Sequence, residues 1–347
     1  MDSQFKPLTV VVIGVGQMGR SHLLAYHNNP GYQVVGILAR HPPALPAELK
    51  HYENLLFPDL TTALVLKPDV VSINSHTDTH AQYAVAAMEA GAHVFLEKPI
   101  ATTVAEAEKV VETAKRTGKK LVIGYILRHH PSWVEFIRQA RLLGPPFVMR
   151  MNLNQRSTGE AWRIHKQILE NTSPVIDCGV HYIDVMLQIT DSRPVQVRGM
   201  GVRLSDEIDA RQVNYGHLQI IFEDGSVGWY EAGWGPMISE TAYFVKDIMG
   251  PKGSVSIVMD EGKKSADVDS HTKTSNIRVT HVDGTDKMLS MDGEPDHNAL
   301  CALEQEFLLQ AIREDRDLSK HMNDAVRSLE IVLAADSSMR ENRAIDL

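Results

Sequence analysis

Cysteine is scarce in this sequence, because only Cys178 and Cys301 occur among its 347 residues. A framework of disulfide bonds is therefore excluded, and a reducing compartment is the simpler expectation. No apolar run approaches the roughly 18 residues of a membrane helix, and the N-terminus lacks the basic segment that opens a signal peptide. We therefore expect a cytoplasmic protein with no membrane partner.

Positive charge is also in short supply. Lysine and arginine total 35 against 44 aspartates and glutamates, which gives a formal net charge of −9. Proteins that bind a nucleic-acid backbone usually carry a basic surface, so nucleic acid is not an expected partner. The hydrophobic share of 43% and the charged share of 23% are ordinary for a globular protein. The length suits two domains of roughly 100–200 residues each.

Strand-like and helix-like segments alternate through residues 1–124. The run LTVVVI at 8–13 is continuous and apolar, as in strands buried on both faces of a parallel sheet. Further strands are expected over 32–38, 70–73, 93–97 and 121–124, and helices over 18–28, 79–90 and 103–117. This alternation predicts an α/β domain with a parallel, doubly wound sheet.

Longer strands joined by short turns follow residue 125. We predict strands over 147–155, 195–204, 213–222, 226–234 and 254–259, and helices over 131–143, 298–313 and 323–340. Residues 260–296 are polar and turn-rich, which indicates surface loops or edge strands. The pattern predicts an α+β domain with a mostly antiparallel sheet, so the expected domains are 1–124 and 125–347.

A glycine-rich segment follows the first predicted strand. Gly14-Val15-Gly16-Gln17-Met18-Gly19 fits G-x-G-x-x-G and opens a predicted helix, which is the context a dinucleotide site requires. The first glycine permits a tight turn, the second admits a pyrophosphate, and the third lets helix and strand pack closely. The alternative is a strand-to-helix turn that holds no ligand.

The end of the second predicted strand bears on the choice of cofactor. An NAD site usually carries an acid there, but this chain has Ala39-Arg40-His41. Arg40, together with His41, is suited to hold a 2′-phosphate, which favours NADP over NAD. Alternatively, Arg40 stacks on adenine, an interaction that suits either cofactor.

Glu97-Lys98-Pro99 ends a predicted parallel strand, where ligands bind in folds of this kind. Lys98 is therefore a candidate to point its ammonium group at a substrate oxygen. Pro99 is suited to fix the turn, and a cis Lys98–Pro99 bond is one way to do so. The alternative is an ordinary surface lysine at a strand end.

A polar stripe marks the apolar segment 174–190 (PVIDCGVHYIDVMLQIT). A helix turns about 100° per residue, so Asp177, His181 and Asp184 fall within a wedge of roughly 60°. Burying these groups together is costly unless they line a cleft or pair with one another. The stripe is therefore a candidate functional site, and the alternative is a buried Asp–His pair that supports packing.

No metal site is expected. The chain has 16 histidines, but none of them forms a complete ligand set with the spacing of a metal motif.

Together these features resemble the Gfo/Idh/MocA oxidoreductase family, named for glucose–fructose oxidoreductase, inositol dehydrogenase and the rhizopine-catabolism protein. The resemblance rests on the early G-x-G-x-x-G, on Glu97-Lys98-Pro99, and on residues 177–184 (DCGVHYID), which fit the family's D-x-G-x-H-x-x-D pattern. It implies a Rossmann domain followed by an α+β domain with an open, mostly antiparallel sheet. That sheet commonly mediates homodimers or homotetramers.

The resemblance also implies a set of site residues. The catalytic residues would be Lys98, Asp177 and His181, and the substrate-binding residues Lys98, Tyr125, Asp177, His181 and Tyr182. The cofactor-binding residues would be Gly14, Gly16, Gln17, Met18, Gly19, Arg40, Ser75, Thr77, His80, Glu97, Lys98, Trp162 and Arg163.

The implied activity is NAD(P)-dependent transfer of hydride to or from a secondary alcohol or ketone of a sugar, cyclitol or related polyol. An NAD-dependent glycoside hydrolase or lyase that works through transient oxidation is the alternative. A non-catalytic nucleotide sensor is a third possibility, but a sensor has no need of the intact set Lys98, Asp177 and His181.

Overall fold

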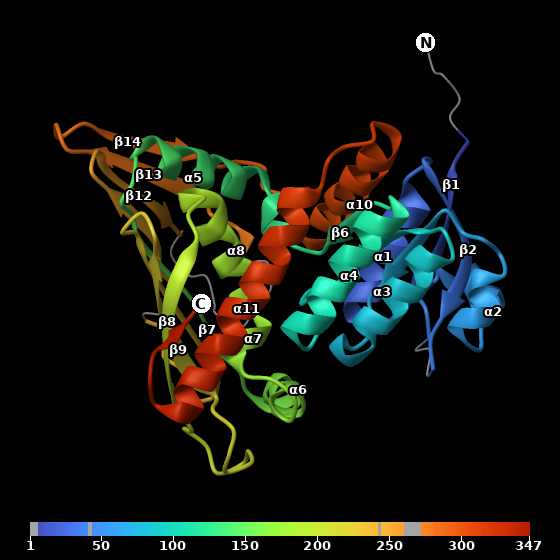
Figure 1. Ribbon diagram of the computed structural model, residues 1–347, viewed down its shortest axis with the longest axis horizontal. Coiled ribbons are helices and arrows are strands. Elements are labelled where there is room, and N and C mark those ends of the chain that lie inside the picture. The colour runs from blue at the N-terminus through green and yellow to red at the C-terminus, as the bar shows by residue number, and fades with distance from the viewer. Residues whose placement is uncertain (1–5, 41–43, 242–243, 260–271) are drawn as a thin grey trace. The chain divides into compact units, whose positions relative to one another are not determined.

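The computed structural model describes residues 6–40, 44–241, 244–259 and 272–347. The chain divides into two compact units, drawn in Figure 1. The first comprises Met1–Ile126 with Asp296–Val326, and the second comprises Leu127–Pro295 with Arg327–Leu347. Among the described residues, no helix combines the length and the hydropathy needed to cross a lipid bilayer.

The first unit contains a six-stranded parallel sheet with the order β3-β2-β1-β4-β5-β6. Its strands are β1 (Leu8–Ile13), β2 (Tyr32–Leu38), β3 (Leu56–Phe57), β4 (Val70–Ile73), β5 (His93–Leu96) and β6 (Leu121–Ile123). The central strands are apolar and fully buried, as Val11, Val71 and Phe95 illustrate with exposures of 0%. The predicted parallel, doubly wound sheet is confirmed.

The first unit also contains helices, and all of them except α10 lie between its strands in the sequence. They are α1 (Gln17–Asn28), α2 (Leu60–Leu64), α3 (His80–Glu89), α4 (Val104–Thr117) and α10 (His297–Arg313), with short 3-10 turns η1 (Lys50–Leu55), η2 (Thr77–Thr79) and η3 (Ile126–Arg128). Local sequence sets the ends of α4. Thr103 and Glu106 form a reciprocal capping box, and Gly118 ends the helix in the left-handed conformation with φ of 66°.

The C-terminal part of the first unit differs from the predicted domain limits. We expected all residues after 124 in the second domain, but α10 and the start of α11 (Ser319–Glu341) belong to the first unit. The reason is packing on α1 and β2: Tyr32 Oη donates a hydrogen bond to the Gln305 carbonyl at 2.8 Å. The side chains of His22 and Gln305 meet at 2.9 Å.

The second unit contains a nine-stranded sheet with the order β14-β13-β12-β11-β7-β10-β9-β8-β15. Its strands are β7 (Val148–Arg156), β8 (Pro194–Val202), β9 (Tyr215–Phe222), β10 (Val227–Gly235), β11 (Lys246–Gly250), β12 (Gly253–Val258), β13 (Asn276–His281), β14 (Asp286–Ser290) and β15 (Ile345–Asp346). All neighbours are antiparallel except β7 and β10. This confirms the open, mostly antiparallel sheet. Part of the predicted loop region, residues 260–271, lies outside the described residues.

Figure 1 shows helices α5 (Pro131–Leu142), α7 (Pro174–Asp177) and α8 (Gly179–Thr190) on one face of this sheet; α6 (Gly159–Leu169) precedes α7. The single helix predicted over 174–190 is instead two, with the break at Cys178. The His181 N–H bonds to the Cys178 carbonyl only three residues back, which interrupts the α-helical pattern. Asp177 therefore ends α7 and does not share the helix of His181.

Two glycines allow α1 to begin close to β1. Gly14 has φ of +81°, and a Cβ on it would lie 2.5 Å from the Asn74 carbonyl oxygen. A Cβ on Gly19 would lie 2.0 Å from the Gly14 carbonyl oxygen. Only glycine fits at these two positions, because both clashes involve backbone atoms. Gly16 differs, because a Cβ there would meet nothing within 4 Å.

We therefore expect Gly19→Ala to destabilise the first unit by about 2–3 kcal/mol, the usual range for an over-packed site. Gly16→Ala is the matched control, and we expect its free energy of unfolding to stay within about 0.5 kcal/mol of the parent chain. Urea denaturation followed by circular dichroism measures both values. Equal midpoints for the two variants would contradict this account of the β1–α1 packing.

Candidate active site

The glycine loop presents an open helix N-terminus. Gly16 is the N-cap residue of α1, its cap has no side-chain hydrogen bond, and the first turn holds no acidic residue. Gln17 and Met18 begin the helix. The first N–H groups of a helix have no partner within the helix, so they are available to an anion such as a pyrophosphate. Binding of a pyrophosphate at this helix N-terminus stays a prediction.

Arg40 lies two residues beyond the end of β2, and its side chain is exposed. No acidic residue stands between Leu38 and Arg40. The position matches the expected site of the adenosine ribose. His41, the other residue considered for a 2′-phosphate, lies outside the described residues.

The loop after β4 is held by hydrogen bonds among its own groups. The hydroxyl groups of Ser75 and Thr79 lie 2.6 Å apart. His80 is 1% exposed, and its ring nitrogens lie 2.8 Å from the Pro99 carbonyl and 3.0 Å from the Ser75 carbonyl. Burial lowers the pKa of His80. His80 therefore joins two loops, whereas Ser75 and Thr77 remain half-buried at the edge of the sheet.

The turn after β5 carries the candidate lysine. The Lys98–Pro99 bond is cis, and Lys98 is half-buried. Glu97 is only 7% exposed. One of its carboxylate oxygens lies 2.8 Å from His22 Nε2, and the other accepts the Lys98 N–H at 3.0 Å. His22 was not among the expected site residues.

Tyr125, expected to contact substrate, follows β6 and is fully buried. Its ring lies edge-on to His321, with the centroids 6.4 Å apart. Its contact with substrate stays a prediction.

In the second unit, Asp177 and His181 are both half-buried near the break between α7 and α8. The Cys178 thiol lies 3.6 Å from an oxygen of Asp177. His165 on α6 also interacts electrostatically with Asp177. Burial lowers the pKa of His165 to about 4, and the Asp177 carboxylate opposes this shift. His165 stacks on Trp234 at 4.4 Å, a contact that the sequence did not reveal.

Asp184 is 1% exposed and forms a bidentate pair with Arg128, at 2.8 Å and 2.5 Å. Gln188 donates a third hydrogen bond to its carboxylate at 3.0 Å. The buried charge of Asp184 is therefore compensated by a guanidinium group, the geometry in which such pairs are strongest. Arg128 pairs with the polar stripe from outside residues 174–190, so helical spacing within that segment did not reveal it.

Tyr182 lies among core aromatic side chains. It is 3% exposed and stacks on Tyr230 with the centroids 5.2 Å apart, and Trp133 meets it edge-on. The expectation that Tyr182 binds substrate is not supported, because one step along α8 turns its side chain about 100° from His181.

Trp162 and Arg163 each interact with an acidic side chain of the second unit. The Trp162 ring is 5% exposed, and its Nε1 donates a hydrogen bond to Glu207 at 3.1 Å. Arg163 is about half exposed and pairs with Glu160, three residues earlier on α6. Arg163 is therefore held by its own helix.

Lys246 on β11 is the most unusual charge in the second unit. It is 2% exposed, with its ammonium 4.8 Å from the Tyr182 ring and 4.2 Å from the Phe244 ring. Its Nζ donates a hydrogen bond to the Asn152 carbonyl. Burial lowers the pKa of Lys246 to about 7. This amine therefore releases its proton in the neutral range on folding.

Comparison with known proteins gives matches over both units. A family model described as "Oxidoreductase family, NAD-binding Rossmann fold" matches residues 8–125. A second, described as "Oxidoreductase family, C-terminal alpha/beta domain", matches residues 139–347. Both models describe the Gfo/Idh/MocA family.

Two curated relatives act on sugars by name. The UDP-N-acetylglucosamine 3-dehydrogenase of Acidithiobacillus ferrooxidans is 32% identical over 57% of this chain and 59% of its own length. The D-glucoside 3-dehydrogenase of Escherichia coli is 24% identical over 82% of this chain and 90% of its own length. The chain thus spans less than two thirds of the first relative and most of the second.

A solved structure shares the fold over nearly the whole chain. The aldose-aldose oxidoreductase of Caulobacter crescentus superposes with a TM-score of 0.80 at 20% identity, and covers 99% of this chain and 100% of its own. Identity at this level supports the fold alone.

The titration of Lys246 gives a testable linkage between pH and stability. Its pKa falls from 10.5 in the unfolded chain to about 7 on folding, so the unfolded state binds more protons between these values. Stability therefore rises with pH across that window. We expect Lys246→Met to be stabilised relative to the parent chain at pH 7, and to lose up to about 3 kcal/mol of that advantage by pH 9.5.

Urea titrations at pH 7, 8.5 and 9.5 measure this difference. Lys252→Met is the control, since Lys252 is exposed. A constant difference between Lys246→Met and the parent chain across the series would show that Lys246 titrates normally.

Proposed function

Because this chain belongs to the Gfo/Idh/MocA family of oxidoreductases, we propose that it transfers hydride between a nicotinamide cofactor and a secondary alcohol or ketone of a sugar, cyclitol or related polyol. The observation that carries the proposal is the half-buried Lys98 on a turn built around a buried carboxylate, in the same unit as the glycine loop. An ammonium held at the carboxyl end of a parallel strand is placed where such sheets bind ligands.

The first unit has groups that suit the cofactor. The open N–H groups of Gln17 and Met18 would receive the pyrophosphate, and the open space beside Gly16 admits it. Ser75, Thr77 and Glu97 stand at the ends of neighbouring strands, where the nicotinamide half would lie. When bound, the nicotinamide ring supplies the hydride acceptor or donor.

The protein residues would handle the proton and the oxygen. In the oxidation direction, His181 takes the hydroxyl proton of the substrate as the general base. Lys98 donates a hydrogen bond to the same oxygen and stabilises the negative charge that develops on it. Asp177 binds a neighbouring hydroxyl group or orients the imidazole. Asp184 takes no direct part, because Arg128 and Gln188 hold its carboxylate.

The substrate class follows from chemistry common to the relatives. Two of them are named as sugar 3-dehydrogenases and another, from Salmonella typhimurium, as inositol 2-dehydrogenase. All three names denote oxidation of a ring carbinol. We extend that class to this chain, with NADP preferred over NAD because Arg40, and no acid, follows β2.

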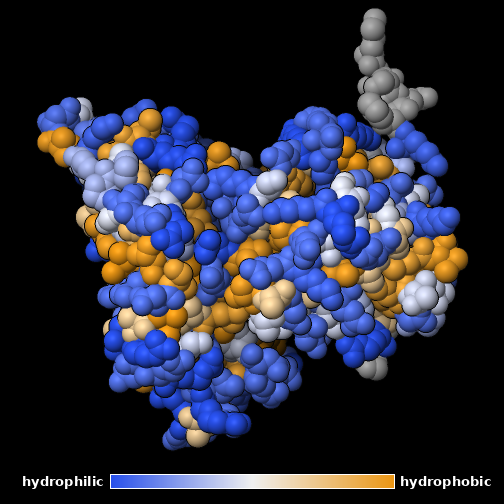
Figure 2. Space-filling view, viewed as in Figure 1, coloured by the Kyte–Doolittle hydropathy of each residue, from blue (hydrophilic) through white to orange (hydrophobic). Residues whose placement is uncertain are grey.

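We further propose that the chain forms homodimers or homotetramers through its large sheet. Val148, Ile221 and Val227 are neighbours across β7, β9 and β10, and each is about 40% exposed. Met149 and Tyr230 point to the opposite face of the same strands, where they are fully buried. On the face of the molecule drawn in Figure 2, hydrophobic residues are interspersed with hydrophilic ones. Apolar patches of this kind commonly mark an interface.

A panel of sugars, inositols and keto-sugars, each with NAD and NADP, tests the activity by absorbance at 340 nm. We expect Lys98→Met and His181→Ala each to lower kcat by about 100-fold or more, the usual contribution of a general base or of an oxyanion donor. Tyr182→Phe is the control, and we expect near-normal kcat from it. Near-normal turnover in Lys98→Met or His181→Ala would contradict these catalytic roles. Glycoside cleavage with no net change in NAD(P)H would favour the hydrolase instead.

The preference for NADP depends on Arg40. We expect Arg40→Ala to raise the KM for NADP by about tenfold, because one charge-assisted contact to a phosphate is lost, and to leave the KM for NAD within about twofold. Arg20→Ala is the control, since Arg20 lies on α1 beyond the glycine loop. An equal rise in both KM values would show that Arg40 stacks on adenine and does not read the phosphate.

A further inference from the structure

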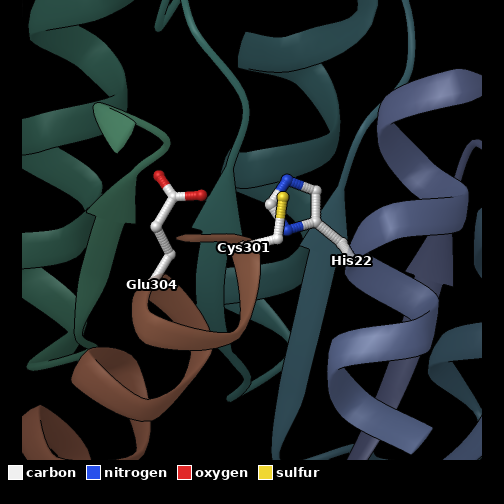
Figure 3. Close-up of side chains that lie close together, drawn as sticks. All are labelled: His22, Cys301 and Glu304. Carbon is white, nitrogen blue, oxygen red and sulfur yellow. The ribbon is translucent and has the colours of Figure 1, made fainter. Parts of the chain in front are cut away.

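A cluster of buried polar side chains lies within the first unit, behind the Lys98 turn. Figure 3 shows three of them, His22 from α1 with Cys301 and Glu304 from α10. One nitrogen, sulfur or oxygen atom of each lies within 4.8 Å of the others, and all three are buried. Such a set resembles the ligands of a zinc ion.

The hydrogen bonds of His22 argue against a metal. Its Nε2 lies 2.8 Å from Glu97 Oε1, and its Nδ1 lies 2.9 Å from the amide nitrogen of Gln305. Both ring nitrogens are therefore engaged, and a metal would have to displace one of these bonds. An amide nitrogen can only donate a hydrogen bond, so the Nδ1 atom of His22 accepts one from Gln305. The Nε2 atom therefore carries the ring proton and donates a hydrogen bond to Glu97. Gln305 thereby selects the tautomer of His22.

The Glu97 carboxylate has hydrogen-bond partners at both of its oxygens. Its second oxygen accepts the Lys98 backbone N–H at 3.0 Å. Behind it, Gly124 leaves the needed space, because a Cβ there would lie 3.3 Å from the carboxylate carbon and from both oxygens. The carboxylate thus connects His22 on α1 to the backbone of the candidate catalytic lysine.

Glu304 is the second buried carboxyl group of the cluster. It is 1% exposed, and its Oε1 has no hydrogen-bond partner among the described residues. Burial, together with the charge of Glu97, raises the pKa of Glu304 well above its usual range. Burial also raises the pKa of the Cys301 thiol. Burial therefore favours the neutral forms of Glu304 and Cys301.

We propose that Gln305, His22 and Glu97 form a positioning relay that fixes the Lys98 backbone and so aims its ammonium at the substrate. The proposal rests on the proposed function, because it takes Lys98 as the catalytic ammonium. His22 and Gln305 act only through Glu97 and are positioning residues. Losing the hydrogen bonds of His22 lowers kcat and leaves cofactor affinity intact, because His22 and Gln305 are not among the proposed cofactor-binding residues.

The first measurement needs no substrate. In protein labelled with 15N-lysine, the Lys98 amide is assigned by its loss in Lys98→Arg, and its hydrogen exchange is followed by NMR. We expect exchange to rise on the order of tenfold in His22→Leu, the factor that corresponds to one lost hydrogen bond. In His22→Gln we expect near-parental exchange, because the glutamine amide restores a donor to Glu97.

Tyr32→Phe is the matched control. It removes the buried hydrogen bond from Tyr32 on β2 to the Gln305 carbonyl, so it perturbs the same residue of α10, but it leaves the relay in place. We expect Lys98 exchange in this variant to match the parent chain. Equal acceleration in Tyr32→Phe and His22→Leu would assign His22 a merely structural role, and unchanged exchange in His22→Leu would overturn the relay.

Turnover of an active member of the substrate panel is the second measurement. We expect kcat of His22→Leu to fall by about tenfold or more with the cofactor KM within twofold, and to recover in His22→Gln. Lost cofactor binding in His22→Leu would overturn the proposal, as would one equivalent of zinc in the purified protein. If no substrate is turned over, the proposed function fails while the exchange result still decides whether the relay exists.

Discussion

The close approach of α1 to β1 is the constraint on which the first unit depends. Gly19 lets the first turn of α1 lie against the Gly14 carbonyl, and Gly14 itself lies against the backbone of Asn74 after β4. That approach opens the helix N-terminus to an anion, and it also brings His22, three residues after Gly19, within hydrogen-bonding distance of Glu97. One packing requirement therefore serves both the cofactor loop and the turn that carries Lys98.

Two buried ionisable groups of the second unit, Asp184 and Lys246, differ in how the cost of burying their charge is reduced. Asp184 is fully compensated by the two hydrogen bonds from Arg128, so its cost of burial is largely offset. Lys246 has aromatic rings and a carbonyl oxygen around it, and it lowers its pKa to about 7 instead. The Arg128–Asp184 pair joins α8 to η3, and the contact of Lys246 with the Tyr182 ring joins α8 to β11.

The sequence predicted the parts of the fold that local pattern controls. Five of the six strands of the parallel sheet are apolar runs whose limits were predicted to within a residue or two, as for Val70–Ile73, whereas the two-residue strand β3 was not predicted. β11 was missed because its first residue is a buried lysine, Lys246, whose partners are aromatic rings. The unit to which α10 belongs was predicted wrongly, because contacts between residues far apart in the chain, such as Tyr32 and Gln305, which are 273 positions apart, leave no local signal.

The same limit applies to the site. The resemblance to a family directed attention to Lys98, Asp177 and His181, but His22 and Arg128 come from outside the motifs. Tyr182 was misassigned because it adjoins His181 in sequence yet packs among the core aromatic rings. Spacing along one helix also could not anticipate the break at Cys178.

The order of elements along the chain has a consequence for synthesis. The first unit is completed by Asp296–Val326, which emerge only after the 169 residues from Leu127 to Pro295. At about 5–20 residues per second, a ribosome takes roughly 10–30 s to make that stretch. Throughout this interval the sheet of the nascent Rossmann unit lacks α10, and His22 has no Gln305 to set its tautomer. The glycine loop can form early, but the support beneath Lys98 is among the last parts of the protein to be assembled.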